Sequence, residues 1–343
     1  MAWTTFPYTK TQIRNAGKIL KMNPKNLEAL DILSSFRSAH AYPLNSIQDN
    51  LRKQARKVEK DTDSVIISQR LKRMPSILSK IEREPSMELT RMQDIGGCRA
   101  IFATTQEVEA CKNALIKSKM QHKRERMYDY IEDPKNSWYR GIHIVYKFVS
   151  ESPQFSQYND MLIEVQLRTR LQHNWATAVE TVGIFTGEAL KSSQGNEDWQ
   201  DFFRLVSTWF AHKEWQKIIP NTPSDIAQIK RELRVYMENL KVEETLAGFS
   251  HTIKVLEELP KKNGYILLIL NPTEKKISWK VFDKDQIEMA SEFYAALEQK
   301  NQEKKDQQIV LFSLESAINL KKAYPNYFWD TKDFMKNLNE IFV

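Results

Sequence analysis

An aspartate stands at a position in this sequence where it could hold a metal ion. Asp94 precedes two glycines and an apolar run that ends at Phe102, so it would lie at the mouth of a strand. Glycines allow a ligand to approach the backbone closely. A carboxylate in such a place can bind Mg²⁺ while water and phosphate complete the coordination. Taken alone, Asp94 could also be an ordinary turn or helix-capping aspartate.

A second acidic residue lies in a segment that alternates like a strand, Met161–Thr169. Its alternate positions would share one face of a sheet. That face carries an acid, an amide and a cation in succession, at Glu164, Gln166 and Arg168. This pattern predicts the floor of a site, although Glu164 could also be an exposed strand residue.

Cations gather between these acids and the amino terminus. Residues 64–70 are rich in β-branched side chains and predict a strand, on which Arg70 and Lys72 would face one side. Ser76 is expected to cap a helix that begins at Ile77, and Lys80 follows one turn later. A strand end and a helix start rich in cations suit a polyphosphate, although an ordinary basic edge has the same pattern.

The stretch Asp129–His143 combines aromatic, cationic and turn-forming residues in a short loop between predicted strands. Tyr139 offers a flat face for a base, while Lys135, Arg140 and His143 could meet phosphates. A surface hairpin with half-buried aromatic residues explains the same composition equally well.

The remaining pattern predicts helices and strands that would support these residues. Expected helices cover residues 26–40, 45–60, 106–119, 170–184, 196–213, 224–259 and 287–299, with a final amphipathic helix ending at Phe342. Further strands are expected at residues 142–149, 265–270, 276–282 and 307–313. A short helical turn is expected at residues 87–92, and Pro43 is expected to close the first helix.

Charge and composition restrict the class of protein. The 343 residues carry a net charge of +7. The first eighty residues hold an excess of about nine positive charges, which favours polyanionic partners over a merely solvated helix surface. No apolar run is long enough to cross a membrane, no signal peptide is evident, and Cys98 and Cys111 offer no disulfide framework or zinc site. We expect a cytoplasmic protein without a membrane partner.

Four motifs in order make residues 45–215 resemble the RelA/SpoT-type nucleotide pyrophosphokinases. They are Arg70-Leu-Lys72 with Ser76 and Lys80, Asp94-Ile-Gly-Gly-Cys-Arg99, Asp129-Tyr-Ile through Tyr139-Arg-Gly-Ile-His143, and Glu164-Val-Gln-Leu-Arg-Thr169. The resemblance implies an enzyme that transfers the β,γ-pyrophosphate of ATP to a ribose 3′-hydroxyl. It also implies an α+β fold, with flanking helices around a mixed, nucleotidyltransferase-like sheet.

The resemblance implies a role for each residue of these motifs. Asp94 and Glu164 would be catalytic and would hold Mg²⁺, with Glu164 accepting the proton of the attacking hydroxyl. Residues expected to bind ATP are Arg70, Lys72, Ser76, Lys80 and Arg99. Residues expected to bind the acceptor are Lys135, Tyr139, His143, Gln166 and Arg168. Reactions of this kind depend mainly on alignment and charge neutralisation, which suits many cations around two acids.

Two departures from the family pattern affect the acceptor. Ser137-Trp138 stands where Asn-Gly commonly precedes the tyrosine, and Gly141 stands where a serine often follows. Both put free GDP or GTP in doubt as the acceptor without excluding it. The metal-dependent hydrolase domain of the longer family members is not present, so we expect no hydrolase activity.

Residues near the carboxyl end resemble the Tyr-x-x-Tyr segment of CapRel-type fused toxin–antitoxin proteins. Tyr324 and Tyr327 carry the resemblance, which implies that they inhibit the enzyme by occupying the adenine pocket. From the residues alone, a small local core is as good an explanation. The implied acceptor is the tRNA 3′-CCA end, and the implied trigger is a phage structural protein. The alternative is a small alarmone synthetase that makes (p)ppGpp from ATP and GDP or GTP.

These expectations together predict four regions. A helical amino-terminal region would cover residues 1–44, the pyrophosphokinase domain residues 45–215, and a helical linker residues 216–260. A small α+β domain over residues 261–343, similar to a pseudo-zinc finger but without cysteine ligands, would regulate the enzyme and sense phage.

Overall fold

The computed structural model describes residues 6–58, 65–186, 197–219, 222–240, 242–243, 246, 264–271, 276–283, 285–304, 308–313 and 332–342. Tyr324 and Tyr327 lie outside the described residues. The chain divides into two compact units. The first contains Met1–Ala100, Glu109–Tyr128 and Ile142–Leu167, and the second contains Ile101–Val108, Asp129–Gly141 and Arg168–Val343.

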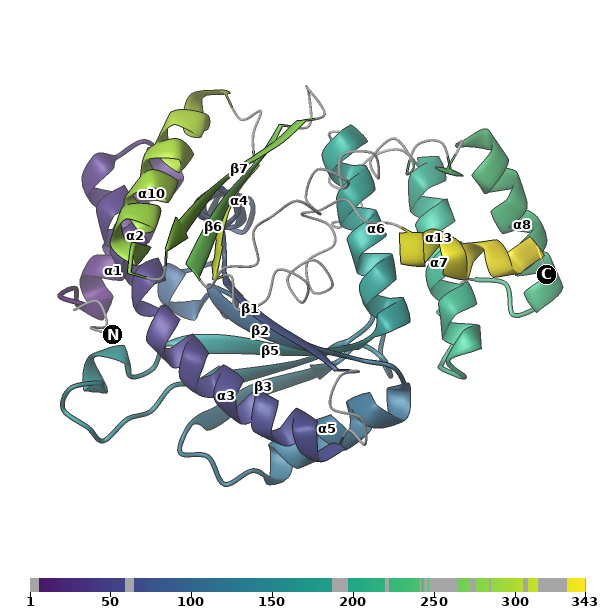
Figure 1. The fold of residues 1–343 in the computed structure, drawn as a ribbon, viewed down its shortest axis with the longest axis horizontal. Helices are drawn as coiled ribbons and strands as arrows, with labels where there is room; N and C mark the ends of the chain where they lie inside the picture. Colours follow the sequence, from purple (N-terminus) through teal and green to yellow (C-terminus); the bar gives the residue numbers. More distant parts are fainter. Residues whose placement is uncertain are drawn as a thin grey trace. The chain divides into compact units, whose positions relative to one another are not determined.

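A five-stranded sheet positions the residues of the motifs. Glu164 lies on one of its strands, and Lys72 and Asp94 lie just outside the ends of two others. The strand order is β1-β2-β5-β4-β3, so β3 lies at one edge (Figure 1). The bounds are Ile66–Leu71 for β1, Gly96–Phe102 for β2, Lys123–Asp129 for β3, Ile142–Lys147 for β4 and Leu162–Thr169 for β5. Strands β4 and β5 are antiparallel. The predicted α+β class with a mixed sheet and flanking helices is confirmed.

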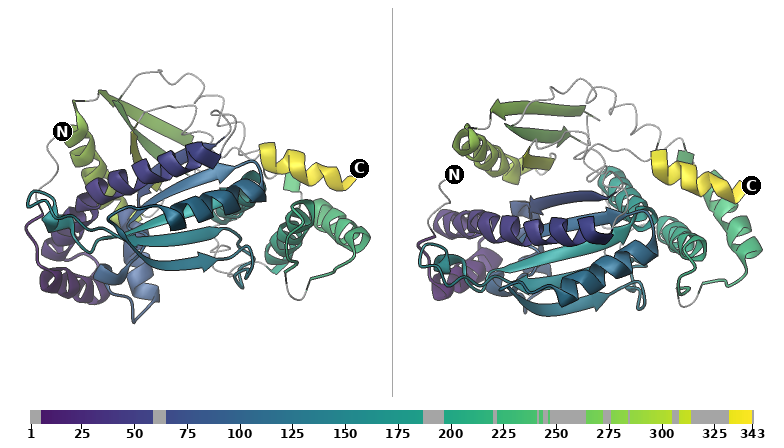
Figure 2. Two further views of the ribbon diagram at one scale, coloured as in Figure 1. Left: turned by 90° about the horizontal axis from the view of Figure 1, so that it is seen from below. Right: turned by 60° about the horizontal axis from the view of Figure 1, so that its bottom comes forward.

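Helix α3 (Ala41–Val58) runs along the sheet, and α5 (Thr105–Lys117) connects β2 to β3 (Figures 1 and 2). Gly96 shows how closely α3 packs. A Cβ atom there would lie 2.6 Å from Ile163 Cδ1 and about 3.5 Å from the Cβ atoms of His40 and Leu44. Because Gly96 has no side chain, the start of α3 can lie close to β2.

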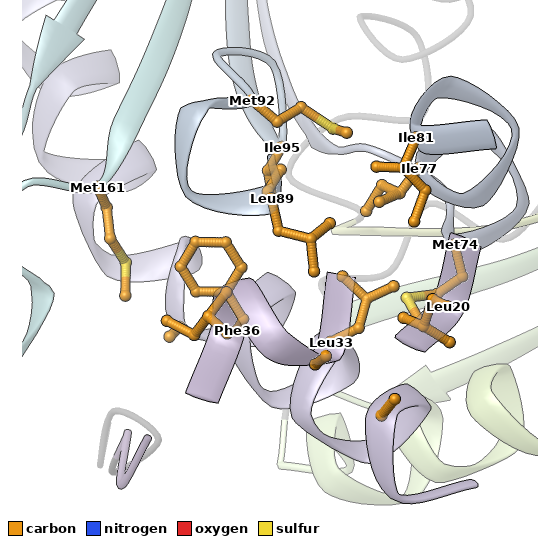
Figure 3. Close-up of a cluster of buried hydrophobic side chains, with 14 of the residues drawn as sticks. Leu20, Leu33, Phe36, Met74, Ile77, Ile81, Leu89, Met92, Ile95 and Met161 are labelled. Atoms are coloured by element: carbon orange, nitrogen blue, oxygen red, sulfur yellow. The ribbon is translucent and has the colours of Figure 1, made fainter. Parts of the chain in front are cut away.

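An apolar cluster joins the amino-terminal helices to the start of the sheet (Figure 3). It is built by α1 (Lys10–Met22), α2 (Leu27–Ala39), α4 (Met74–Arg83) and the short helix η1 (Leu89–Arg91). Leu33, Ile77 and Ile95 are each fully buried in it. Because Ile95 is buried in it, and α4 and η1 closely precede Asp94 in the sequence, this cluster fixes the segment that carries Asp94.

Helices α6 (Arg170–Thr186), α7 (Glu197–Lys213) and α8 (Ile226–Asn239) belong to the second unit. Helix α13 (Lys332–Asn339) and the turn η5 (Glu340–Phe342) pack on them. The Phe334 ring lies 6.3 Å from Phe203 and 6.0 Å from Phe210 of α7. Lys213 Nζ also pairs with Glu340 at 2.7 Å. Residues near the carboxyl end thus complete the hydrophobic packing of α7.

A second sheet contains β6 (Gly264–Asn271), β7 (Lys276–Asp283) and β8 (Gln308–Ser313), in the order β7-β6-β8. Both neighbours run antiparallel to β6. Helix α10 (Ile287–Lys304) covers it through Ala290 and Tyr294, which are buried with Leu267 and Ile309. The predicted hairpin, helix and third strand are therefore confirmed.

Three local expectations were wrong or incomplete. Helix α1 was not predicted, although Thr9 and Gln12 form a capping box at its start. Helix α4 begins at Met74, so Ser76 lies inside its first turn instead of capping it. Pro43 does not end a helix but lies in the first turn of α3, where a proline is tolerated.

The predicted helix from residue 224 is shorter than expected, because α8 ends at Asn239. Residues 250–259 of that prediction lie outside the described part of the chain. Among the described helices, none is both long and apolar enough to cross a membrane.

Candidate active site

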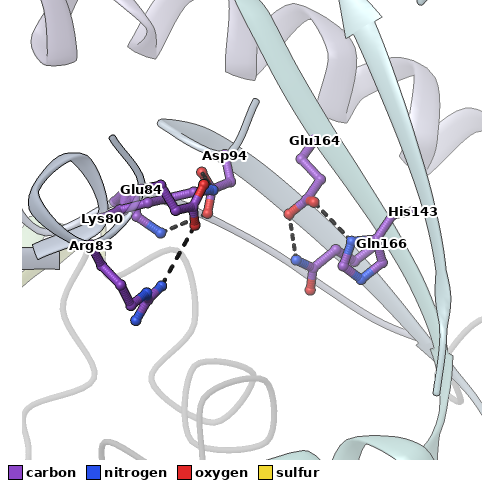
Figure 4. Close-up of polar contacts among 8 residues, drawn as sticks. Lys80, Arg83, Glu84, Asp94, His143, Glu164 and Gln166 are labelled. Carbon is purple, nitrogen blue, oxygen red and sulfur yellow. Dashed lines mark hydrogen bonds and ion pairs between the residues drawn. The ribbon is translucent and has the colours of Figure 1, made fainter. Parts of the chain in front are cut away.

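Asp94 lies between two lysines, one from the end of β1 and one from α4 (Figure 4). Lys72 Nζ lies 2.6 Å from Asp94 Oδ2, and Lys80 Nζ lies 3.2 Å from Asp94 Oδ1. The side chains of all three residues are at least three quarters buried. Each carboxylate oxygen thus has its own cationic donor, and the roles predicted for these residues in binding ATP and Mg²⁺ stay predictions.

The charges in this cluster depend on one another. Burial alone would raise the pKa of Asp94, but the positive charges of Lys72 and Lys80 outweigh it and lower that pKa. Burial lowers the pKa of Lys72, and the charges of Lys80 and Arg70 act in the same direction, whereas Asp94 opposes them. A polyphosphate that neutralises these cations would therefore reduce the repulsion of Lys72 by Lys80 and Arg70.

Glu164 is held at both of its oxygens. His143 Nδ1 lies 2.8 Å from Oε1, and Gln166 Nε2 donates to Oε2 at 2.6 Å (Figure 4). The register of the hairpin explains the arrangement, because His143 on β4 is directly opposite Gln166 on β5. Opposed residues of an antiparallel pair lie on the same face of the sheet. His143 and Gln166, which are expected to bind the acceptor, are thus brought to Glu164.

Glu164 remains ionised under ordinary conditions. Burial acts to raise its pKa, but the charge and hydrogen bond of His143, the bond from Gln166 and the charge of Lys72 together lower it well below the usual range. The negative charge of Glu164 in turn acts to raise the pKa of Asp94. Two ionised carboxylates that influence each other across the ends of β2 and β5 form the acidic centre of the site.

The backbone explains why the acids come together. Lys72 N donates to Ile95 O at 2.7 Å, which joins the end of β1 to the start of β2. Arg37 Nε donates to Lys72 O at 2.6 Å and holds the same peptide from the other side. A Cβ atom on Gly97 would lie 3.7 Å from Glu164 O, so β2 and β5 are adjacent at this level.

The two carboxylates fit a divalent cation that keeps several non-protein ligands. Mg²⁺ is commonly bound through one or two carboxylates plus substrate phosphates and water, and both acids are ionised, as such a ligand must be. Among the described residues, no group of three or more His, Cys, Asp or Glu side chains could hold a metal ion. A cation here would thus depend on the phosphates of the substrate for its remaining ligands.

Three other residues expected to bind ATP have less specific positions. Arg70 lies on β1, and its charge acts on Lys72. Ser76 and Arg99 are half-buried on α4 and β2. Their roles stay predictions.

The loop Asp129–Gly141 in the second unit contains a compact stack of cations and aromatic rings. Lys135 Nζ lies 4.2 Å from the Tyr130 ring centre and 5.3 Å from that of Tyr139. The Arg168 guanidinium lies 4.9 Å from the Tyr139 ring centre. Tyr139 is only 7% exposed. A base that stacks on Tyr139 would therefore have to displace one of these cations or stack together with it.

The carboxyl-terminal part of this loop is held by hydrogen bonds to α7 and to the residues that follow it. Trp138 has a left-handed backbone with φ of 62°, and its carbonyl accepts a hydrogen bond of 2.7 Å from the buried Ser207 hydroxyl. Arg140 is 3% exposed and donates to the Lys217 carbonyl. The expectation that Arg140 meets phosphates was wrong, because its guanidinium anchors the loop instead.

Ser207 was missed by sequence reasoning. It lies 69 residues beyond Trp138 in an ordinary helical pattern, and no local signal marks it.

Glu214, just after α7, accepts a 3.2 Å hydrogen bond from Gln172 Nε2. Burial raises the pKa of Glu214 to about 7, against the opposing effects of Thr169, Gln172 and Arg140.

The sequence was compared with protein families and with known proteins. Residues 69–183 match the family model described as a region found in RelA / SpoT proteins. The matched residues include Asp94, His143 and Glu164. None of the curated proteins compared matches the chain.

Solved structures of small alarmone synthetases resemble part of the chain. Small alarmone synthetase 1 from Bacillus subtilis is 23% identical, with a TM-score of 0.45, over 54% of this chain and 93% of that one. A GTP pyrophosphokinase family protein from Streptococcus pneumoniae is 23% identical, with a TM-score of 0.43, over 55% and 89%. Residues 69–183 thus match a region found in RelA / SpoT proteins and contain Glu164 and Asp94 with its two lysines, the features of an ATP-dependent pyrophosphokinase.

Proposed function

We propose that this enzyme transfers the β,γ-pyrophosphate of ATP to the 3′-hydroxyl of a tRNA CCA end. The 3′-oxygen forms a bond to the β-phosphorus of ATP. The bond between that phosphorus and the oxygen leading to the α-phosphorus breaks, and AMP leaves. The hydroxyl proton passes to Glu164. The observation that carries the transfer chemistry is the pair of ionised acids, Asp94 and Glu164, beside Lys72 and Lys80.

The lysines, the acids and the residues that hold Glu164 each have a separate task in this scheme. Lys72 and Lys80 neutralise phosphate oxygens and would exchange Asp94 for the nucleotide as partner. Asp94 and Glu164 would hold Mg²⁺, which supplies further neutralisation of the phosphates when it is bound. His143 and Gln166 fix the Glu164 carboxylate, so that one orientation is presented to the acceptor hydroxyl.

The acceptor base is proposed to stack on Tyr139. Lys135 and Arg168 now lie against that ring at 5.3 and 4.9 Å. A guanidinium can stack on a base as well as on a tyrosine, so Arg168 could cover the other face of the bound base. The anchors at Trp138 and Arg140 would keep the rest of the loop in place during this exchange.

An RNA acceptor is supported by exposed cations at the edge of the sheet. Strand β3 is the edge strand, and its residues Lys123, Arg124 and Arg126 are all exposed. Charged side chains also protect edge strands from pairing with other chains. A basic edge in addition to the basic amino-terminal residues nevertheless suits a long polyanion better than a single nucleotide.

The alternative is synthesis of (p)ppGpp from ATP and GDP or GTP. It uses the same acids and cations, and the family match agrees with it equally well. Small alarmone synthetase 1 from Bacillus subtilis has been solved bound to its product pppGpp. Only the identity of the acceptor separates the two functions.

Identification of the labelled acceptor tests the proposal. The protein is incubated with γ-labelled ATP and with tRNA, GDP or GTP in separate reactions. We expect label on tRNA, and no label on a matched tRNA that ends in 3′-deoxyadenosine, because that end lacks the nucleophile. Label on guanosine nucleotides alone would refute the tRNA proposal and establish the alternative. The Glu164→Gln variant serves as the control for contaminating kinases.

We further propose that the residues around Tyr324 and Tyr327 restrain the enzyme until a phage structural protein binds the carboxyl-terminal region. The test must avoid truncation, because α13 and α8 complete the packing of α7, which holds the acceptor loop. Alanine at both tyrosines in the full chain should raise pyrophosphate transfer and cellular toxicity. Alanine at Trp215, an aromatic residue that is 96% exposed and does not line the site, provides a matched control. Unchanged transfer and toxicity would refute the restraint.

A further inference from the structure

The first unit contains a cavity that the proposed reaction does not use. Its volume is about 500 Å³, within the range of small-molecule sites. The lining comes from the segment before α1, from α1 itself and from the region of η1. The inner part of β3, the end of β4 and the start of β5 complete it. We call it the α1 pocket. None of the residues expected to bind ATP or the acceptor lines it.

The α1 pocket adjoins the catalytic acids. Gln93, which lines it, immediately precedes Asp94. Leu162 lines it too, two residues before Glu164 on β5, and is opposite Lys147 on β4. Residues two apart on a strand share a face and are about 7 Å apart. The pocket therefore begins next to Glu164, on the side opposite to His143 and Gln166.

Positive charge dominates the lining. Two of its lysines already have partners in the pocket, since Lys10 pairs with Asp160 at 2.5 Å and Lys147 with Glu125 at 2.9 Å. Three arginines of the lining remain, of which Arg14 also pairs with Glu88 outside the lining at 3.4 Å and Arg126 donates to the Tyr128 hydroxyl at 3.4 Å. They are Arg14, Arg91 and Arg126. All three are exposed to solvent and can reach an anion without being desolvated first.

One wall of the pocket is aromatic. Phe6 contacts Tyr8 at 6.1 Å and Phe36 at 5.8 Å between ring centres. His40 is uncharged there, because burial lowers its pKa to about 4 despite the bond to Phe36 O. Thr90 Oγ1 is buried at the pocket and has no hydrogen-bond partner among the described residues. The pocket thus offers flat apolar surface, an unused polar atom and excess cations.

We propose that the α1 pocket is a second nucleotide subsite, which holds the nucleotide adjoining the reacting one in an RNA acceptor. Its phosphate would meet Arg14, Arg91 and Arg126, and its base would lie against the aromatic wall. A single-nucleotide acceptor has no adjoining unit and leaves the pocket empty. The proposal rests on the proposed RNA acceptor and explains how the enzyme would distinguish an RNA end from GDP.

Binding to the full chain carrying Glu164→Gln, which blocks turnover, tests the subsite. The probes are a fluorescent RNA trinucleotide CCA, AMP and GDP, the last two measured by competition. Arg14→Ala, Arg91→Ala and Arg126→Ala should each weaken CCA binding about tenfold, as expected for a lost charge-assisted phosphate contact. AMP and GDP binding should change less than about twofold in our proposal. Lys18→Ala is the matched control, since Lys18 is exposed on the same helix as Arg14 but does not line the pocket.

Each outcome bears on the proposal separately from the choice of acceptor. CCA binding equal in the arginine variants and in Lys18→Ala would overturn the subsite, even if the parent enzyme labels tRNA. Equal weakening of CCA, AMP and GDP would also overturn it, because the arginines would then belong to a single-nucleotide site. If the parent labels only GDP or GTP, the proposed RNA acceptor itself fails. The thermal midpoints of all variants verify that the exposed substitutions leave the fold intact.

Discussion

Replacement of Glu164 by glutamine is the sharpest single perturbation of the site. The carboxylate accepts two hydrogen bonds, at 2.8 Å from His143 and at 2.6 Å from Gln166. Glutamine keeps the shape but loses the charge, and its amide nitrogen needs an acceptor, which Gln166 can offer by turning its amide or His143 by its other tautomer. Loss of the charge makes both bonds neutral, which costs about 1 kcal/mol of unfolding free energy for each bond.

The effect on catalysis should exceed the effect on stability. Loss of a proton acceptor typically lowers a rate by about 10²–10⁴-fold, so we expect kcat for pyrophosphate transfer to fall in that range. ATP affinity should fall by less than the rate, because Lys72 and Lys80, which would meet the phosphates of ATP, are unchanged in this variant. Single-turnover transfer from γ-labelled ATP measures the rate, and equilibrium binding measures the affinity.

The pH dependence of stability provides an independent check. Because the folded-state pKa of Glu164 lies below its ordinary value of 4.5, its contribution to stability is present above about pH 4.5 and is lost as the pH falls below it. The Gln variant should lack that part of the acid-induced loss. Glu109→Gln, an exposed glutamate on α5 that pairs with Lys112, is the matched control. A Glu164→Gln enzyme within tenfold of the parent kcat would refute the catalytic role.

Four further predictions follow from other contacts. Asp94→Asn leaves two buried lysines without a carboxylate, so a Mg²⁺ titration of activity should show at least a tenfold higher half-saturation and a lower maximum. Ser207→Ala removes the bond to the Trp138 carbonyl, so it should raise the KM for the acceptor several-fold, leave the KM for ATP unchanged and cost about 1 kcal/mol in denaturant unfolding. Phe334→Ala should cost about 3–5 kcal/mol in the same measurement, because a ring only 2% exposed leaves a cavity beside α7. Since the pKa of Glu214 is raised to about 7, the protonated form favours the folded state, and stability should fall as the pH rises from about 4.5 to 7; Glu214→Gln should flatten that slope in unfolding titrations.

The placement of the two acids could be predicted from the sequence because its signals are local, whereas their expected catalytic roles came from the family resemblance. Alternation on β5 placed Glu164 and Gln166 on one face, and the glycines after Asp94 marked a strand mouth. The bond from His143 to Glu164 could not be predicted in the same way, because it depends on the register between β4 and β5. Register is set by the turn and by burial of a whole face rather than by any single residue.

Long-range anchors were the main omission. Arg140 looked like a phosphate ligand, because an arginine in a polar loop usually faces solvent, yet its partner is a carbonyl 77 residues later. Ser207 has no signal at all in its helical surroundings. The start of α4 was misplaced because Ser76 resembled a cap, whereas Pro75 at the second helical position fits a start at Met74.

The packing of α13 on α7 has a consequence for the order of synthesis. Domains fold as units while the chain emerges from the ribosome. Helix α7 holds the acceptor loop through Ser207, but it gains the aromatic contact of Phe334 only after residues 332–342 have been made. A nascent chain would thus carry complete catalytic acids and an incompletely supported acceptor loop. For an enzyme proposed to block translation, this order would delay full activity until residues 332–342 have been made.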